Sequence, residues 1–309
     1  METREWALIV FTILSQMSIG AFVVLGIVHF FAVPKAGPAE ADRLSDRALL
    51  AIGPTLVLGM VASFFHLGNP LNGPLAVSNL ATSWLSREIL LVVSFCIVGA
   101  VFALMQWRKI GTPRIRNGLA LIAALIGLAQ VYSMSMVYVL PTQPYWSVPF
   151  ATPLAFFITT FLLGALSIGS ALVANYAYVR RKQPACAETQ CALLRDTVKG
   201  IAVAAVVLLG IQLVAAPLQL SLLAGQGEPA AIESAGRLTQ EFGVLYGLRL
   251  VLVFVGAGLF GLFLYRNASV AGRERLMGNV VYTAFAFVLV AEVVGRFLFY
   301  AAHVKIGLS

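Results

Sequence analysis

The chain has 309 residues, of which 60% are hydrophobic and only 11% are charged. An average soluble domain carries about 25% charged residues, so water is not the main solvent of this chain. The net charge of +8 would suggest a nucleic-acid partner for a soluble protein. Here the basic residues lie in short connectors between apolar runs, which indicates contact with lipid headgroups and no nucleic-acid partner.

The three cysteines, Cys96, Cys186 and Cys191, include no CxxC pair. This spacing indicates neither a disulfide framework nor a cysteine-ligated zinc or iron-sulfur site. Any iron-sulfur chemistry is therefore expected to belong to a partner.

Eight apolar runs follow one another along the chain, each long enough to cross ~30 Å of hydrocarbon as a helix. They lie near residues 6–33, 48–67, 84–106, 118–140, 151–179, 197–223, 242–265 and 276–301. The first run is too long for a signal peptide and follows Glu2, Arg4 and Glu5, so we expect it to be retained. The sequence predicts an all-α integral membrane protein, a bundle of eight transmembrane helices in a single membrane domain over residues 1–309.

The distribution of basic residues predicts the orientation of this bundle. The first, third, fifth and seventh connectors and their flanks hold 15 of the 21 Lys and Arg residues, and six lie elsewhere. Cytoplasmic loops are enriched in Lys and Arg, so we expect these four connectors in the cytoplasm and both termini outside (N-out/C-out). The same rule places the loops near 68–83, 141–150 and 224–240 outside. The first two carry few charges, which suits either a docking surface for another subunit or a short re-entrant segment.

Ionisable side chains inside the spans need a reason, because a charge near the bilayer centre costs ~2.5 to 3.5 kcal/mol on insertion scales. Five such residues are Arg87, Glu88, Arg249, Glu292 and Arg296. The topology places all five in the outer half of the membrane, at the same depth as His66 and His303. Seven ionisable residues from four spans could thus converge on one site.

Each of these residues also has a structural explanation. Glu292 and Arg296 have the i, i+4 spacing of an ion pair within one helix. Arg87 lies near the interface, where its guanidinium can snorkel to water. Arg249 is deeper, so we expect Glu88 or Glu292 to be its partner. His66 could serve as a cap or an interfacial residue.

Three classes of membrane protein are compatible with a polar cluster of this kind. A quinone site needs hydrogen-bond partners and a proton acceptor near one leaflet. A transporter would place its substrate groups near the midplane, which the one-sided cluster disfavours. A haem-b cytochrome needs two histidines at matching depth, and only His66 with His303 could supply them. Because His303 lies beyond its apolar run, we expect no haem and no metal in this chain.

Several motifs together resemble one known family, the DmsC-like membrane-anchor subunits of dimethyl sulfoxide reductase and related molybdenum enzymes. The resemblance covers almost the whole chain. The motifs are His66-Leu67-Gly68-Asn69-Pro70, Ser83-Trp84-Leu85-Ser86-Arg87-Glu88-Ile89, residues 144–153, Tyr246-Gly247-Leu248-Arg249, and Ala291-Glu292-Val293-Val294-Gly295-Arg296 followed by Phe299-Tyr300 and His303.

This resemblance implies a multi-pass anchor in the bacterial inner membrane. Such an anchor oxidises menaquinol, or ubiquinol, and passes electrons to an iron-sulfur subunit that feeds a molybdopterin catalytic subunit. In that family the histidine of the first motif and the glutamate of the second are associated with the quinol site, which implies catalytic roles for His66 and Glu88. Some members have Asn where this chain has Arg87, so the resemblance implies that Arg87 marks a subgroup with a different partner or quinone.

We extend the expected quinol-binding set by depth to Arg87, Arg249, Glu292, Arg296 and His303. Glu88 or His66 would accept a hydroxyl proton, while Arg249, Glu292 and Arg296 would orient the ring. The sequence leaves the direction of electron flow open. A related anchor could instead reduce quinone with electrons from a donor such as sulfite, and a small-molecule transporter is a further alternative.

Overall fold

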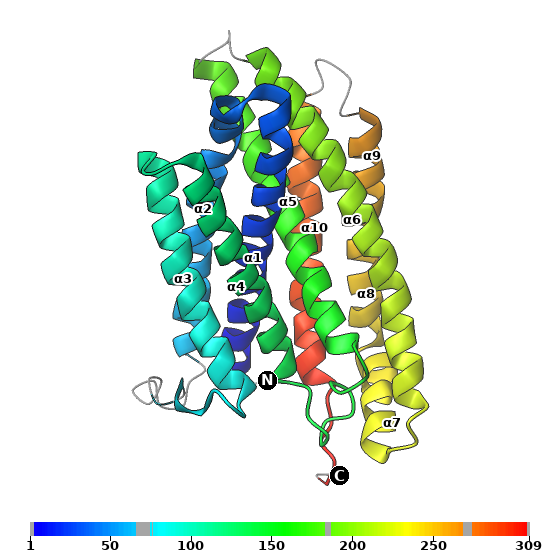
Figure 1. Cartoon of the computed structure of the whole chain (residues 1–309). Helices are drawn as coiled ribbons and strands as arrows, with labels where there is room; N and C mark the ends of the chain where they lie inside the picture. Colours follow the sequence, from blue (N-terminus) through cyan, green and yellow to red (C-terminus); the bar gives the residue numbers. More distant parts are fainter. Residues whose placement is uncertain (1–2, 66–74, 76, 183–186, 268–273, 308–309) are drawn as a thin grey trace.

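The structure, a computed structural model, describes residues 3–65, 75, 77–182, 187–267 and 274–307 (Figure 1). All regular elements within these ranges are helical. Eight helical segments are long and apolar enough to cross a membrane. The prediction of an all-α protein with eight long apolar helices is therefore confirmed.

Seven of the spans are single helices, and the remaining span, the seventh along the sequence, is built from three consecutive helical pieces. The single helices are α1 (Thr3–Ala36), α2 (Pro38–Phe64), α3 (Trp84–Arg108), α4 (Pro113–Met136), α5 (Ala151–Lys182), α6 (Ala187–Ala224) and α10 (Glu274–Ala301). The composite span runs through α8 (Gly243–Val253), the π-helical turn η4 (Phe254–Leu259) and α9 (Phe260–Asn267). A short helix α7 (Pro229–Gly236) and a π-helical turn η3 (Arg237–Glu241) occupy the segment predicted as the outer loop 224–240.

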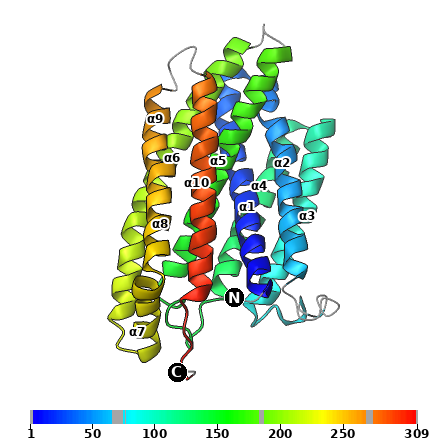
Figure 2. The same cartoon turned by 180° about the vertical axis from the view of Figure 1, so that it is seen from behind.

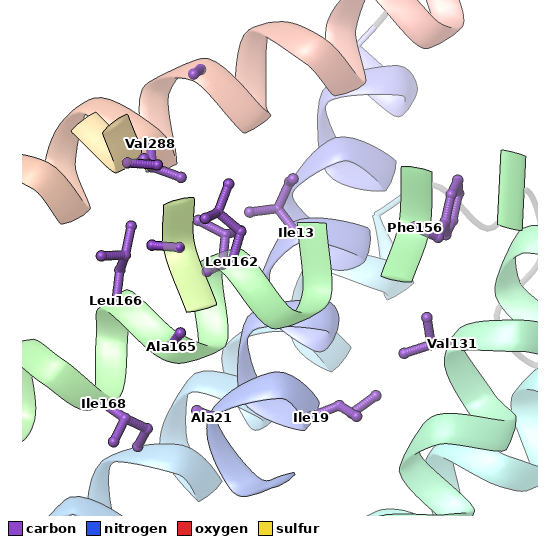
Figure 3. Packing of buried hydrophobic residues seen from close by; sticks show 14 of the residues in the cluster. Ile13, Ile19, Ala21, Val131, Phe156, Leu162, Ala165, Leu166, Ile168 and Val288 are labelled. Atoms are coloured by element: carbon purple, nitrogen blue, oxygen red, sulfur yellow. The ribbon is translucent and has the colours of Figure 1, made fainter. Parts of the chain in front are cut away.

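Helices α1 and α5 form the centre of the bundle. Their apolar windows are 67% and 72% buried, whereas no other span exceeds 39%. Helices α2, α3 and α4 lie on one side of this pair, and α6, α8 and α9 lie on the other, with α10 beside α5 (Figures 1 and 2). Buried side chains such as Ile13, Val131, Leu162 and Val288 fill the space between these helices (Figure 3).

The central helices approach closely because both have glycine at the contact. A Cβ atom on Gly20 of α1 would overlap the carbonyl oxygen of Thr160, and one on Gly164 of α5 would overlap the backbone of Gly20. Small residues at such contacts let helix backbones pack together in a membrane, where association depends on close packing and not on exclusion of water. The pair Gly20 and Gly164 therefore fixes the core of the bundle.

Helix α2 begins at Pro38, earlier than the predicted span near residue 48. Gly37 has a φ of 83°, a left-handed conformation that glycine adopts without strain, and it turns the backbone directly from α1 into α2. Proline is favoured at the first helical position because its missing N–H would have no partner there. As a result, Arg43 and Arg47 of the predicted connector lie within the helix.

Helix α3 begins at Trp84, where its span was predicted to start. The side chain of Ser83 accepts a hydrogen bond of 3.2 Å from the backbone N–H of Ser86, which is a typical N-terminal cap. This cap places Glu88 in the second turn of the helix, close to the end of the bundle that holds both termini (Figure 1).

A polar network closes the opposite end of the bundle. Lys109 donates hydrogen bonds of 2.7 and 2.8 Å to Asp42 and Asp46 of α2, and Gln106 donates to both carboxylates. Arg116 of α4 in turn donates to Gln106. Burial alone would lower the pKa of Lys109, but its bonds with the two carboxylates outweigh burial and raise that pKa above its ordinary value. The network thus ties α2, α3 and α4 together.

Candidate functional site

Glu88 lies buried on α3, with 7% of its surface exposed. Its carboxyl group interacts electrostatically with the phenol groups of Tyr138 and Tyr300. These two hydroxyls share a hydrogen bond of 2.7 Å, which joins the segment after α4 to α10. Burial raises the pKa of Tyr138 well above its usual value, so this phenol stays protonated. A buried acid is therefore electrostatically coupled to a hydrogen-bonded pair of phenols.

Arg296 of α10 is also buried, and its contacts come from α1 and α5. Its Nη2 donates a hydrogen bond of 2.7 Å to Oε1 of Gln16, and Nε2 of Gln16 donates to the carbonyl of Phe156. The guanidinium lies 3.8 Å above the ring centroid of Phe156. Arg296 is thus held by an amide and an aromatic face, two contacts that orient a cation without neutralising it.

Glu292, one turn before Arg296 on α10, receives side chains from three other helices. Thr159 donates a hydrogen bond of 2.6 Å to one of its oxygens, and Gln212 donates one of 3.0 Å to the other. Arg249 of α8 lies 3.8 Å away, which confirms Glu292 as one of the two partners expected for this arginine. A Cβ on Gly295 would overlap the Arg249 guanidinium, so the glycine makes room for this ion pair.

The residues around Arg296 and those around the Arg249–Glu292 ion pair form a single electrostatic cluster. Arg296 interacts with Glu292 and Arg249, and also with Tyr138 and Tyr300 beside Glu88. The cluster therefore continues from the Glu88 carboxyl through the phenols and Arg296 to the Glu292 ion pair. The structure brings four of the predicted site residues, Glu88, Arg249, Glu292 and Arg296, into this one cluster.

His303 lies beside the cluster, beyond the end of α10. Its ring stacks on Trp146 at a centroid distance of 4.1 Å, and its Nδ1 lies 2.6 Å from the carbonyl oxygen of Tyr300. Trp146 donates a hydrogen bond of 2.8 Å to the carbonyl of Phe299. Burial lowers the pKa of His303, although the bond to the Tyr300 carbonyl opposes this shift. His303 and Trp146 thus form an aromatic wall at the terminal end of the bundle.

One predicted residue, Arg87, does not join the cluster. Arg87 points to the preceding loop, where it donates hydrogen bonds of 2.9 and 2.6 Å to the carbonyls of Leu80 and Ala81 and covers the Trp84 ring. This placement fits the interfacial alternative for Arg87. His66 lies outside the residues that the structure describes, so its place in the site stays a prediction.

Other members of the cluster were not selected from the sequence as site residues. They are Gln16, Tyr138, Thr159, Gln212 and Tyr300. All are uncharged, so a search for charges within apolar spans does not find them. Gln16 and Gln212 carry the best available signal, because an amide inside a long apolar run needs a partner.

Glu292 and Arg296 do not form the ion pair within α10 that their i, i+4 spacing suggested. Among the described residues, Glu292 pairs with Arg249 from another helix, while Arg296 donates to Gln16. Both charges therefore serve contacts between helices. A buried acid beside phenols and a fixed guanidinium can donate and accept hydrogen bonds and take up a proton, which is the chemistry that a hydroquinone ring requires.

Comparison with known proteins gives a consistent result over the whole sequence. The family described as DMSO reductase anchor subunit (DmsC) matches residues 1–302. One anaerobic dimethyl sulfoxide reductase polypeptide of Escherichia coli (strain K12) is 27% identical across 99% of this chain and 97% of its own length. A second from the same organism, YnfH, is 28% identical over the same shares. A sulfite dehydrogenase subunit of Allochromatium vinosum is 29% identical over 52% of this chain and 51% of its own length.

Proposed function

Because the chain belongs to the family of dimethyl sulfoxide reductase anchor subunits, we propose that it is the quinol-oxidising membrane anchor of a molybdenum oxidoreductase complex. Its membership makes it a multi-pass membrane protein with electron-transfer and catalytic partners. In the proposal these partners are an iron-sulfur subunit and a molybdopterin subunit, and the membrane is the bacterial inner membrane. The observation that carries the proposal is the buried acid Glu88, whose carboxyl group interacts electrostatically with the paired phenols of Tyr138 and Tyr300.

The proposed reaction removes two protons and two electrons from menaquinol, or from ubiquinol, at this cluster. Glu88 or His66 accepts the two hydroxyl protons one after the other and releases each to water, because both are groups that can act as general bases. Arg296, held by Gln16 and Phe156, orients the ring oxygen through its guanidinium. The electrons leave one at a time to the iron-sulfur subunit, and the quinol is released as quinone.

The proposed orientation follows from the basic connectors, which place both termini and the Glu88 end of the bundle outside. Quinol oxidation at this end would then release its protons outside. If the catalytic partner also consumes protons outside, turnover moves no net charge across the membrane.

A second candidate is the reverse reaction, in which the anchor accepts electrons from a reduced donor, which is thereby oxidised, and uses them to reduce quinone. The similarity to a subunit named as part of a sulfite dehydrogenase favours this candidate. The same cluster would serve both directions, because an acid that accepts a proton from quinol can return one to quinone.

A fluorescent quinone-site inhibitor tests the proposed site in the purified full-length protein. We expect saturable quenching for the wild type, at least tenfold weaker binding for Glu88→Gln, and unchanged binding for the control Glu228→Gln at the start of α7. Wild-type affinity in Glu88→Gln would remove Glu88 from the site. No saturable quenching of the wild type, in the protein alone and in the assembled complex, would reject the quinone site.

A further inference from the structure

An open depression lies on the side of the bundle, and its lining on α1 begins with the residues that follow Gln16. It is shallow, with a volume of about 50 Å³, and lies between α1, α2 and α5. The residues that line it are mostly small or apolar: Met17, Ser18, Ala21, Ala48, Ala51, Ile52, Thr55, Ser167, Ile168 and Ala171. The lining contains no charged side chain, and the hydroxyl of Ser18 is already bonded to the carbonyl of Ile52. The depression therefore suits a hydrocarbon ligand.

Arg47, in the third turn of α2, lies one turn before the lining residue Ala51. Arg47, Ala51 and Thr55 are spaced four residues apart, so they follow one face of the helix. On α5, Ala171 and Asn175 are spaced in the same way. Arg47 donates a hydrogen bond of 2.7 Å to the side chain of Asn175, which shows that both faces meet at the arginine.

Arg47 is held in a defined position although it is exposed. The side-chain oxygen of Asn175 accepts a hydrogen bond from Nη1 of Arg47. The amide nitrogen of Asn175 in turn donates hydrogen bonds of 3.1 and 3.2 Å to the carbonyls of Arg43 and Leu44. The guanidinium also lies 4.1 Å from the ring centroid of Tyr178. No described carboxylate forms an ion pair with Arg47. Its remaining N–H groups can therefore meet an anion at the membrane surface.

We propose that this depression binds one acyl chain of an anionic phospholipid, whose phosphate pairs with Arg47. The ligand must be apolar along most of its length and anionic at one end, because the lining is uncharged and the arginine lies at its head. Arginine suits this role, since its planar donors match phosphate oxygens and it stacks on aromatic rings. The proposal does not depend on the quinol site, and it assigns a lipid site that is separate from it.

Native mass spectrometry of the full-length protein in a mild detergent tests the proposal with two probes, phosphatidylglycerol and the zwitterionic phosphatidylcholine. The wild type is expected to retain phosphatidylglycerol preferentially. Arg47→Gln is expected to weaken that binding about fivefold, the size expected for one basic residue near an anionic lipid surface. Arg47→Lys should recover part of the preference, and the control Arg43→Gln, one turn earlier on α2, should retain it fully.

The apolar part of the site is tested by Ala51→Phe, which fills the depression from an exposed helix position. We expect this variant to lose bound phosphatidylglycerol while it still binds the quinone-site inhibitor. If the wild type retained phosphatidylglycerol and phosphatidylcholine equally, that result alone would overturn the proposal. Unchanged phosphatidylglycerol binding in either Arg47→Gln or Ala51→Phe, or its displacement by a long-chain quinone, would also overturn it.

Discussion

Glu292 shows at the scale of single residues how the bundle accommodates a charge. Only 2% of its surface is exposed, and Thr159, Gln212 and Arg249 reach it from α5, α6 and α8. Burying an ion is costly unless its partners are retained, so removal of one member of a buried pair is more destabilising than removal of both. The ion pair is therefore expected to behave as a unit.

We expect Glu292→Gln to lower the free energy of unfolding by about 3 kcal/mol, because it leaves the Arg249 guanidinium, whose side chain is only 17% exposed, without a counter-charge. The double variant Arg249→Met/Glu292→Met should recover most of this loss. Reversible unfolding in mixed micelles measures both. The exposed pair of Glu233 and Arg237 supplies the control, and Glu233→Gln should change stability by less than about 1 kcal/mol. A double variant less stable than Glu292→Gln would contradict this account.

His303 gives the terminal end of the bundle a dependence on pH. Burial lowers its folded-state pKa below the ordinary value of 6.5, so the unfolded chain binds a proton more readily than the folded chain does. The contribution of neutral His303 to the stability of the folded state is therefore complete above about pH 6.5 and is lost as the pH falls below that value. We expect the melting temperature to fall less between about pH 7.5 and pH 5.5 in His303→Phe, which keeps the ring on Trp146. An equal fall in both proteins would contradict this expectation.

The sequence identified the charged members of the cluster because charges are rare in apolar spans and conspicuous there. It did not identify Gln16 or Tyr138 as site residues. A single polar residue in an apolar run can find a hydrogen-bond partner on any neighbouring helix. Only the fold shows that the partner of Gln16 is Arg296. The surroundings of Arg87 were also ambiguous, because a residue in the first turn of a helix can point to the bundle or to the loop.

At the scale of helices, the pair α1 and α5 determines how the other elements pack. The glycines at their contact, Gly20 and Gly164, leave no space for a side chain. Gly26 lies on the same helix as Gly20, yet a Cβ there would meet no atom within 4 Å. The two positions on α1 thus separate the effect of close packing from the effect of glycine on helix propensity.

We expect Gly20→Ala to destabilise the protein by at least about 1 to 3 kcal/mol, because the methyl group forces α1 away from Thr160 of α5. Gly26→Ala is expected to be neutral or slightly stabilising, since alanine is the better helix former. The melting temperature and the monodisperse fraction after solubilisation measure both variants. Equal behaviour of the two variants would show that the glycine contact does not fix the core.

The number of helices could be predicted from the sequence because each span needs a long apolar run. The residues at which the helices begin and end were harder to predict. Hydropathy stops at the first charges, whereas α2 continues through Arg43 and Arg47 to Gly37, where the backbone turns. Hydropathy also cannot distinguish a loop from the short helix α7. The π-helical turn η4 was not predicted either. It contains Gly256, which packs against Val288 of α10, and this packing depends on a distant helix.

At the scale of the whole molecule, both termini lie at one end of the bundle (Figures 1 and 2), and Glu88, a member of the proposed quinol site, lies in the second turn of α3 near that end. The proposed orientation predicts that this end faces outside. In a background without the three native cysteines, a cysteine at Gln226 should react with a membrane-impermeant maleimide in intact spheroplasts. A cysteine at Arg114 should react only after lysis. The reverse pattern would place the quinol-site end in the cytoplasm and reject the proposed side of proton release.

The most direct test of the central claim is quinol-driven turnover of the assembled complex with Glu88→Gln in this anchor. The proposal predicts that oxidation of a soluble menaquinol analogue falls at least a hundredfold, the size typical of a lost general base. Turnover driven by a dye that reduces the iron-sulfur subunit directly should remain at the wild-type rate. Wild-type rates with both donors would contradict a role for Glu88 in quinol oxidation.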